Sequence, residues 1–306
     1  MVQTVIESKT STVLIGFEKP FCVIGERINP TGRKLLAQEL ENNDFSTVEK
    51  DALEQAKCGA NMLDINAGAV YNSNPNPNET EPPLIKKMIN LVQGLVDLPL
   101  CIDSSVPEAL EAGLEVTEGR PLLNSVTGEE DRLERILPLV KKYNVPVVAI
   151  SNDDTGISED PNVRFAVAKK IVERASDFGI KAHDIIVDPL VMPIGAMATA
   201  GIQVFELIKK LRNELGVNTT CGASNISFGL PNRHGINSAF LPMAIASGMT
   251  SAIMNPVKAQ EMNSIRAANM LMNNDSNGSI WIKNNRADSN NQENSGGRRR
   301  SSRRRK

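Results

Sequence analysis

The stretch VPVVAISNDDTGISEDPNVRFAVAKKIVERASDFGIKAHDIIVD, residues 145–188, decides the fold class. It opens with an apolar run at 145–150 and closes with another at 184–188. Residues 162–179, between the two runs, carry the apolar spacing of an amphipathic helix. A strand, a helix and a second strand in this order predict one parallel β–α–β unit.

The same pattern recurs eight times between about residues 21 and 255. The apolar runs are FCVIG (21–25), NMLDI (61–65), LPLCI (98–102), RPLLN (120–124), VPVVAI (145–150), DIIVD (184–188), NTTCGAS (218–224) and TSAIM (250–254). Eight parallel strands alternating with helices close a TIM (β/α)8 barrel. An open doubly wound sheet is the alternative, but GERINPTGRK (25–34) lacks its glycine-rich phosphate turn.

Helices are predicted at 46–59, 82–96, 130–143 and 162–179, and Gly59, Gly113 and Gly179 stand where C-terminal caps belong. We therefore divide the chain into three parts. Residues 1–20 form an arm or cover the barrel bottom, residues 21–272 form the barrel, and residues 273–306 form a disordered tail rich in Asn, Ser and Arg.

Composition and charge narrow the function classes. No window is apolar over the roughly 18 residues that a membrane span needs, and the first 20 residues lack the order of a secretory signal, so we expect a cytoplasmic protein. Four dispersed cysteines and two histidines argue against disulfides and a zinc site. Seven of the 34 basic residues lie in the last nine, RRRSSRRRK, which leaves 27 basic against 36 acidic side chains in residues 1–297. Nonspecific contacts of this tail are the only nucleic-acid binding that we expect.

Acidic and amide side chains follow nearly every predicted strand. They are Glu26 with Asn29, Asp64 with Asn66, Asp103, Asn124, Asn152, Asp188, Asn225 and Asn255. In a TIM barrel these positions converge at the mouth, where active sites lie. Taken singly, each is as well explained as a helix cap or turn former. Together they suit a flat heterocycle with paired N–H donors, such as a pterin, and the other use of such oxygens is to bind a divalent cation.

Six motifs at these strand ends resemble one family. GERINPTGRK (25–34), MLDINAG (62–68), CIDSS (101–105), LLNSV (122–126), VDPLVMP (187–193) and ASNISFGLPNR (223–233) are similar to the pterin-binding methyltransferases of the methyltetrahydrofolate:corrinoid class. That class includes the folate domain of cobalamin-dependent methionine synthase, and the resemblance covers about residues 20–272. It implies a barrel like that of dihydropteroate synthase and a homodimer.

The resemblance also implies roles for individual residues. Asp103, Asn124 and Asp188 hold the pterin, Asn225 contacts its reacting side, and Arg233 meets the substrate tail or the partner. The flanking positions of the motifs add the folate-binding residues Glu26, Asn29, Asp64, Asn66 and Asn152.

The implied reaction moves a methyl group between 5-methyltetrahydrofolate and the cobalt of a separate corrinoid protein, with the folate as substrate, the cobalamin on the partner and no bound metal. The leaving nitrogen needs a proton or a strong hydrogen bond. We therefore predict Asn225 as a catalytic residue, acting with water and a nearby carboxylate, which we take to be Asp103. The physiological role is either that of a split methionine synthase or that of a demethylation pathway.

Three rival functions stay open. A dihydropteroate synthase would carry a lysine after the seventh strand and Arg-x-His at the eighth, where this chain has SNIS (224–227) and SAIMNPVK (251–258). A non-catalytic folate-binding subunit would not need Asn225, and a metal-dependent aldolase would show a lysine or histidine at a strand end. The insertion YNSNPNPNETEPP (71–83) is either a folate-tail or partner-docking loop or a mobile surface loop.

Overall fold

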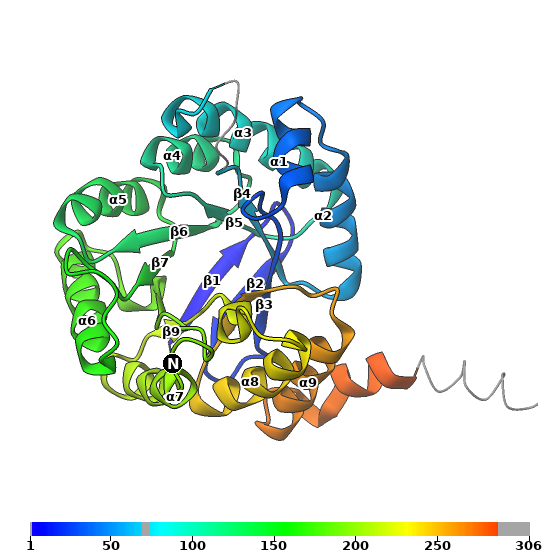
Figure 1. Cartoon of the computed structure of the whole chain (residues 1–306), viewed down its shortest axis with the longest axis vertical. Helices are drawn as coiled ribbons and strands as arrows, with labels where there is room; N and C mark the ends of the chain where they lie inside the picture. Colours follow the sequence, from blue (N-terminus) through cyan, green and yellow to red (C-terminus); the bar gives the residue numbers. More distant parts are fainter. Residues whose placement is uncertain (1, 69–73, 287–306) are drawn as a thin grey trace, which may run out of the picture.

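The computed structural model describes residues 2–68 and 74–286. Its eight barrel strands are β3 (Cys22–Ile28), β4 (Met62–Asn66), β5 (Leu100–Asp103), β6 (Leu122–Thr127), β7 (Val147–Ile150), β8 (Ile185–Asp188), β9 (Asn218–Thr219) and β10 (Ser251–Met254). They pair in parallel in the order β10-β3-β4-β5-β6-β7-β8-β9. A hydrogen bond of 2.8 Å from Ile253 N to Cys221 O closes the ring beside β9. The predicted TIM barrel is confirmed (Figure 1).

Helices cover the outside of the barrel (Figure 1). They are α1 (Lys34–Glu41), α2 (Ser46–Cys58), α3 (Pro77–Leu95), α4 (Pro107–Val116), α5 (Glu130–Tyr143), α6 (Pro161–Asp177), α7 (Ala200–Lys210), α8 (Arg233–Ser247) and α9 (Ala259–Leu271). A five-residue π-helical turn, η2 (Leu211–Leu215), continues α7. Three of the four predicted helices agree with the structure to within two residues, but α3 begins five residues before the predicted start. Asn76 caps it by accepting a hydrogen bond from Asn78 N at 3.2 Å, and Pro77 fills the first turn, where a missing N–H costs nothing.

Two of the three predicted glycine caps have the left-handed backbone that a cap requires. Gly59 ends α2 at φ +96°, and Gly179 follows α6 at φ +70°. Gly113 was wrongly predicted as a cap, because it lies inside α4. A Cβ there would come within 2.7 Å of Cγ2 of Ile102, so this glycine lets α4 pack closely on β5.

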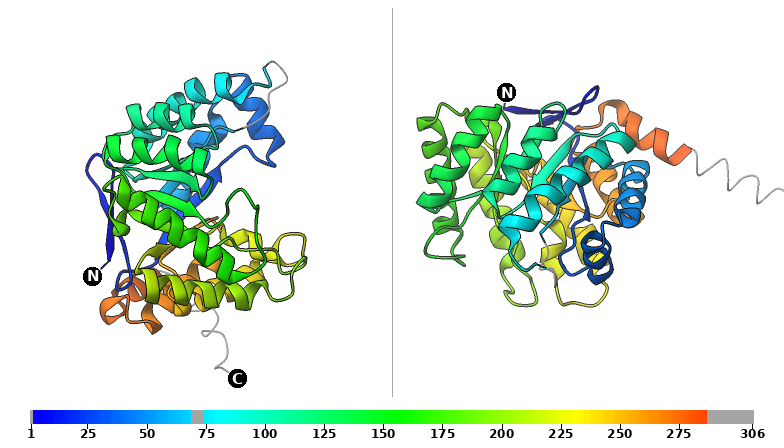
Figure 2. Two further views of the ribbon diagram at one scale, coloured as in Figure 1. Left: turned by 90° about the vertical axis from the view of Figure 1, so that its left-hand side faces the viewer. Right: turned by 90° about the horizontal axis from the view of Figure 1, so that it is seen from above.

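The first 20 residues close the bottom of the barrel. β1 (Gln3–Glu7) and β2 (Thr12–Gly16) form an antiparallel hairpin, which lies at the end opposite the loops that follow the barrel strands (Figure 2). Ile6 and Ile15 are fully buried against the side chains inside the barrel, including Cys22 and Met62. The barrel interior is therefore filled from below by the hairpin.

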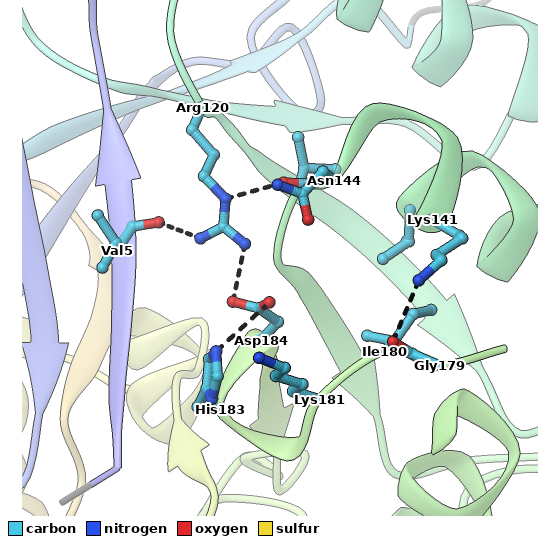
Figure 3. Close-up of a pocket in the computed structure, with 11 residues that line it drawn as sticks. Val5, Arg120, Lys141, Asn144, Gly179, Ile180, Lys181, His183 and Asp184 are labelled. Atoms are coloured by element: carbon cyan, nitrogen blue, oxygen red, sulfur yellow. Dashed lines mark hydrogen bonds and ion pairs between the residues drawn. The ribbon is translucent and has the colours of Figure 1, made fainter. Parts of the chain in front are cut away.

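One arginine joins the hairpin to the barrel (Figure 3). Arg120 donates to Val5 O at 2.6 Å and to Asn144 O at 2.8 Å, and its Nη2 lies 2.9 Å from Oδ1 of Asp184. A cavity of about 400 Å3 lies beside this seam and is lined by Lys141, among others. Since it is at the bottom of the barrel, it is remote from the predicted site.

The ordered chain extends past residue 272, where the sequence placed the start of the tail. A 3-10 turn, η4 (Ser276–Gly278), is followed by helical residues 279–286. The carboxylate of Asp275 accepts hydrogen bonds from Ile280 N at 3.0 Å and Trp281 N at 2.9 Å, which caps this helix. The arginine-rich end of the predicted tail and residues 71–73 of the predicted insertion lie outside the described residues. None of the helices in the described ranges has the length and apolar character to cross a membrane.

Candidate functional site

Neighbouring strands place Asn66, Asp103 and Asn124 in one layer at the mouth of the barrel. Asn66 on β4 lies opposite Asp103 on β5, and Asp103 lies opposite Asn124 on β6. Further round the barrel, Asp188 at the end of β8 lies opposite Ile150 of β7, which in turn lies opposite Thr127 at the end of β6. The carboxyl ends of parallel strands meet at the same end of a barrel, and the predicted convergence follows from this geometry.

Two carboxyl groups lie in this layer and just below it. Asp103 is half-buried, and Asp64, which is 1% exposed, lies close enough on the neighbouring strand for the two charges to interact. Burial raises the pKa of Asp64 well above its usual range, and the negative charge of Asp103 raises it further. Burial also raises the pKa of Asp103 to about 6, which Asn66 opposes by donating from Nδ2 to Oδ2 at 2.8 Å. Asn124, which is largely buried, hydrogen-bonds the Asp64 carboxyl.

The layer keeps capacity for a ligand. Among the described residues, Oδ1 of Asp64 is buried and has no hydrogen-bond partner. A buried acceptor without a partner is costly, so a donor that enters the mouth gains a strong hydrogen bond there. This is the chemistry expected of a site for a heterocycle with N–H donors.

Asp188 sits in a preformed loop. Burial raises the pKa of its carboxyl to about 6, while the hydrogen bond from Leu190 N to Oδ1, 2.8 Å long, lowers it. Leu190 has φ +59°, an unfavourable value for a leucine. Arg164 of α6, which is 1% exposed, holds this loop by donating from Nη1 to Pro189 O at 2.9 Å and to Leu190 O at 2.8 Å.

Asn225 lies on a 3-10 turn, η3 (Ala223–Ser227), after β9, and its side chain is exposed. Its Nδ2 is 3.0 Å from the place that a Cβ of residue 222 would occupy, so a larger residue at 222 would crowd this carboxamide in its present position. Ser224 connects the turn to β3, since its Oγ donates to Oε1 of Glu26 at 3.3 Å. Arg233 connects the turn to α8, donating to Ser224 O at 2.7 Å and to Oγ of Ser227 at 3.1 Å.

Glu26 is a further carboxyl group of the mouth whose pKa is raised. Burial raises its pKa to about 7, and the negative charge of Glu261 raises it as well, against the hydrogen bond from Ser224. Glu261 in turn lies 2.9 Å from Nδ1 of His234. A carboxyl group with a pKa near 7 can hold a proton or release it under physiological conditions.

A cavity of about 420 Å3 opens at the mouth. Of the predicted residues, five line it: Glu26, Asn29, Asp64, Asp103 and Arg233. Asn66, Asn124, Asn152, Asp188 and Asn225 do not line it. No cluster of three or more His, Cys, Asp or Glu residues that could hold a metal ion is present in residues 2–68 and 74–286.

Some of the predicted residues also serve the backbone locally. Oδ1 of Asn29 accepts a hydrogen bond from Thr31 N at 2.9 Å, and Oδ1 of Asn255 accepts one from Val257 N at 3.1 Å. The main chain of Asn152 bonds Gly128 N and Ile150 O. The turn-forming role that the sequence left open is therefore real for Asn29 and Asn255.

Four charged residues around the site were not predicted from the sequence. Arg27 and Arg33 line the mouth cavity and share the buried carboxylate of Asp51 on α2. Arg164 supports the Asp188 loop. Both Arg27 and Arg33 lie within the GERINPTGRK motif, which was the available signal for them. Asp51 and Arg164 lie on amphipathic helices, where a charged residue normally indicates a solvated face.

Comparison with known families agrees with this geometry. The family model described as pterin binding enzyme matches residues 25–255, which include every strand-end residue discussed above. The chain belongs to the pterin-binding enzyme family. The predicted resemblance is confirmed.

Two relatives are identical to this chain at close to a third of the aligned positions. The chain is 32% identical over 256 residues to the methylcorrinoid:tetrahydrofolate methyltransferase of Eubacterium limosum, covering 83% of this chain and 92% of that protein. It is 30% identical over 256 residues to the methionine synthase of Mycobacterium tuberculosis. That match covers 79% of this chain but 21% of the methionine synthase, so it concerns one region of a much longer protein. Since this family is one of enzymes, and since the two relatives are a methyltransferase and a methionine synthase, the chain is an enzyme.

Solved structures support the same fold. The dihydropteroate synthase of Xanthomonas albilineans superposes with a TM-score of 0.66 at 20% identity, covering 88% of this chain and 98% of that one. The enzyme of Vibrio fischeri gives 0.63 at 16% identity, with the same coverage of both chains. At these identities the likeness concerns the barrel alone.

Proposed function

We propose that this protein transfers a methyl group between 5-methyltetrahydrofolate and the cobalt of a separate corrinoid protein. The observation that carries the proposal is the buried group of Asp64, Asp103 and Asn124 at the mouth, with one carboxylate oxygen of Asp64 left without a partner. The similarity to the methylcorrinoid:tetrahydrofolate methyltransferase along most of the chain supports the same reaction.

The side chains of Asp64, Asp103, Asn124 and Asp188 at the mouth, called the acidic layer below, recognise the pterin. Its aminopyrimidine edge presents N–H donors, and the carboxylates of Asp103 and Asp188 accept them in charge-assisted hydrogen bonds. Asn124 offers a donor and an acceptor side by side to the mixed edge of the ring. Because the protein already holds these acceptors in place, binding needs little reorganisation.

Transfer requires that the C–N5 bond breaks and that N5 keeps its electron pair. A proton or a strong hydrogen bond at N5 therefore has to stabilise the leaving amine in the transition state. Asn225 has an exposed carboxamide on the turn after β9, and Glu26, joined to the same turn through Ser224, can hold a proton near neutral pH. The corrinoid supplies the nucleophile that accepts the methyl group.

Methyl transfer in solution tests the proposal. The full chain is mixed with 5-methyltetrahydrofolate that carries a labelled methyl group and with a chemically reduced corrinoid, and label on the corrinoid is measured over time. We expect enzyme-dependent transfer. A chain that binds the folate but transfers no label is a folate-binding subunit, and this result contradicts the proposal.

Dihydropteroate synthesis is the second candidate, because the superposed structures carry out that reaction on the same barrel. The segment after β9 has Asn225 and no lysine, and the segment after β10 has no Arg-x-His. We therefore expect no dihydropteroate from a dihydropterin pyrophosphate and 4-aminobenzoate, measured by chromatography.

The homodimer and the cytoplasmic localisation stay predictions. In support of the dimer, α7 and α8 leave an apolar surface cavity of about 660 Å3, lined by Ile202, Phe205 and Met243, among others. Exposed apolar surface of this kind is typical of contact regions. Light scattering on the purified full chain distinguishes one copy from two.

A further inference from the structure

The mouth cavity is lined by charges of both signs. Asp64 and Asp103 are deep in it, and Asp64 is 1% exposed. The cationic side chains of Arg27 and Arg33 are 34% and 28% exposed, so they lie nearer the solvent. A ligand that fits this cavity has N–H donors at its inner end and negative charge at its outer end.

The two arginines are held by a single carboxylate. Nε and Nη2 of Arg27 lie 3.3 and 3.2 Å from Oδ1 of Asp51, and Nη1 of Arg33 lies 2.7 Å from Oδ2. Nη1 of Arg33 also bonds Arg27 O, which fixes the loop between β3 and α1. Two positive charges on one negative charge leave an excess of one at the edge of the cavity.

Both guanidinium groups keep N–H donors for a ligand. A guanidinium has five N–H donors, and Asp51 uses only one face of Arg27 and one nitrogen of Arg33. Because Asp51 is 2% exposed, it fixes these side chains before a ligand arrives. Preorganised arginines bind carboxylates in bidentate pairs.

Arg233 has a different environment from the other two. It donates to Ser224 O and Oγ of Ser227, so its guanidinium supports the turn that carries Asn225. Among the described residues, the ion pairs of Arg27 and Arg33 are both with Asp51 and not with the carboxyl groups that line the cavity. The anion-binding capacity is therefore centred on Arg27 and Arg33.

We propose that Arg27 and Arg33 form a subsite for the glutamate carboxylates at the outer end of the folate substrate. This rests on the proposed function, because it takes the pterin to lie on the acidic layer. The charge order of the cavity then matches the order of groups along the ligand. The subsite favours folates over tail-less pterins and contributes to affinity, without taking part in methyl transfer.

Calorimetric titration of two ligands into two proteins tests the subsite. The ligands are 5-methyltetrahydrofolate and a 5-methyltetrahydropterin that lacks the benzoylglutamate tail. The proteins are the wild type and the triple variant Arg27→Gln/Arg33→Gln/Asp51→Asn, in which Asp51→Asn avoids a buried charge without a partner. We expect the triple variant to bind the folate about tenfold or more weakly, as for the loss of a charge-assisted pair. We expect its affinity for the tail-less pterin to stay within about twofold.

A charge control accompanies the titrations. Arg132 of α5, which donates to Ser105 O at 2.9 Å outside the cavity, is replaced in Arg132→Gln, and we expect both affinities to stay at wild-type values. The tail-less pterin also reports folding, since it needs an intact acidic layer.

The possible failures are distinguishable. If the wild type binds neither ligand, the proposed function is wrong, and the subsite is wrong with it. If the wild type binds both ligands equally well, or if the triple variant weakens both by the same factor, the subsite is overturned and pterin binding stands. A loss confined to the folate supports it, and added salt should then reduce folate affinity in the wild type more than in the variant.

Discussion

The buried carboxyl groups of the mouth make the folded protein less stable at neutral pH. Burial raises the pKa of Asp103 and of Asp188 from the ordinary 3.8 to about 6, and that of Glu26 to about 7. The folded chain therefore binds these protons more tightly than the unfolded chain does. Because the folded chain binds more protons than the unfolded chain in this range, the free energy of unfolding increases as the pH falls from about 7 to about 4. The charged carboxylates are strong hydrogen-bond acceptors for a ligand, but they lower the free energy of unfolding at neutral pH.

The variant Asp188→Asn tests both effects. It keeps an oxygen for Leu190 N–H but removes the buried charge. We expect its melting temperature at pH 7.5 to exceed that of the wild type by about 2–4 °C, for roughly 1 kcal/mol, and the difference to vanish near pH 4. Its affinity for 5-methyltetrahydrofolate should fall by at least about 1.5 kcal/mol. Scanning calorimetry and titration measure the two effects, and an unchanged affinity would remove Asp188 from the site.

Asn225 should act on the rate more than on binding. Replacing it in Asn225→Ala removes the carboxamide from an exposed turn, so folding should be unaffected. We expect turnover of methyl transfer to fall at least about a hundredfold, as for the loss of a transition-state donor, and folate affinity to fall by less than about tenfold. Equal losses in rate and affinity, measured by kinetics and titration, would assign Asn225 to substrate binding alone.

The sequence predicts those site residues that lie at the ends of strands, because the barrel brings all of its strand ends together. Asp103, Asn124 and Asp188 lie at strand ends, and parallel strands in a closed barrel carry their ends to one mouth. Arg164 and Asp51 were not predicted, because a charged residue on an amphipathic helix ordinarily faces water. Only the tertiary structure shows that each of them is buried.

Among the elements, α6 has a part in the site although it contributes no residue to the mouth cavity. Arg164 reaches from it to the two carbonyls of the loop after β8 and to Oε1 of Gln203 on α7, 3.3 Å away. This contact keeps Leu190 in its left-handed conformation and so orients the Asp188 carboxylate. The geometry of the mouth thus depends on how two outer helices pack.

Removing this contact should affect stability and binding together. In Arg164→Met two buried carbonyls lose a charged donor, and we expect a loss of about 2–4 kcal/mol in the free energy of unfolding together with weaker folate binding. Arg174→Met on the same helix is the matched control, because its partners Glu130 and Asp177 are exposed, and its loss should stay below about 1 kcal/mol. Urea titrations of both variants decide the matter: similar losses would mean that Arg164 has no special role.

Element boundaries followed the sequence where caps and apolar runs coincide. The predicted boundaries were wrong at β9, which was expected at 218–224 but spans only Asn218–Thr219. After Thr219 the chain turns toward η3, and only an isolated bridge from Gly222 to Ile253 connects it to β10. The predicted boundaries were wrong also at α3, because the Asn- and Pro-rich residues before residue 82 read as a loop. Pro77 at the helix start and Asn76 as the cap account for the difference.

In the whole molecule, ligand binding depends on one end of the barrel, and the hairpin that stabilises the fold closes the other end. The acidic layer lies at the carboxyl ends of the strands, whereas Ile6 and Ile15 of the hairpin fill the barrel from the other end. Changes in the hairpin should therefore reduce stability without altering the mouth.

Ile15→Ala tests this separation. Ile15 is fully buried, so we expect a loss of about 2–5 kcal/mol in the free energy of unfolding, with the affinity for 5-methyltetrahydrofolate within about twofold of wild type under conditions where the variant is folded. Leu53→Ala on α2, where the leucine is 49% exposed, should change stability by less than about 0.5 kcal/mol. A large loss of folate affinity in Ile15→Ala would show that the two ends are coupled.

The hairpin has a further consequence for how the chain is made. Thr4 contacts His183 O and Nδ2 of Asn218, and that same Nδ2 donates to Ile15 O at 3.0 Å. During synthesis these two partners emerge 179 and 214 residues after Thr4. The hairpin can therefore complete its hydrogen bonds to the barrel only after most of the barrel strands have been made, and until then its buried side chains contact an incomplete barrel interior, which makes this segment a natural client for chaperones.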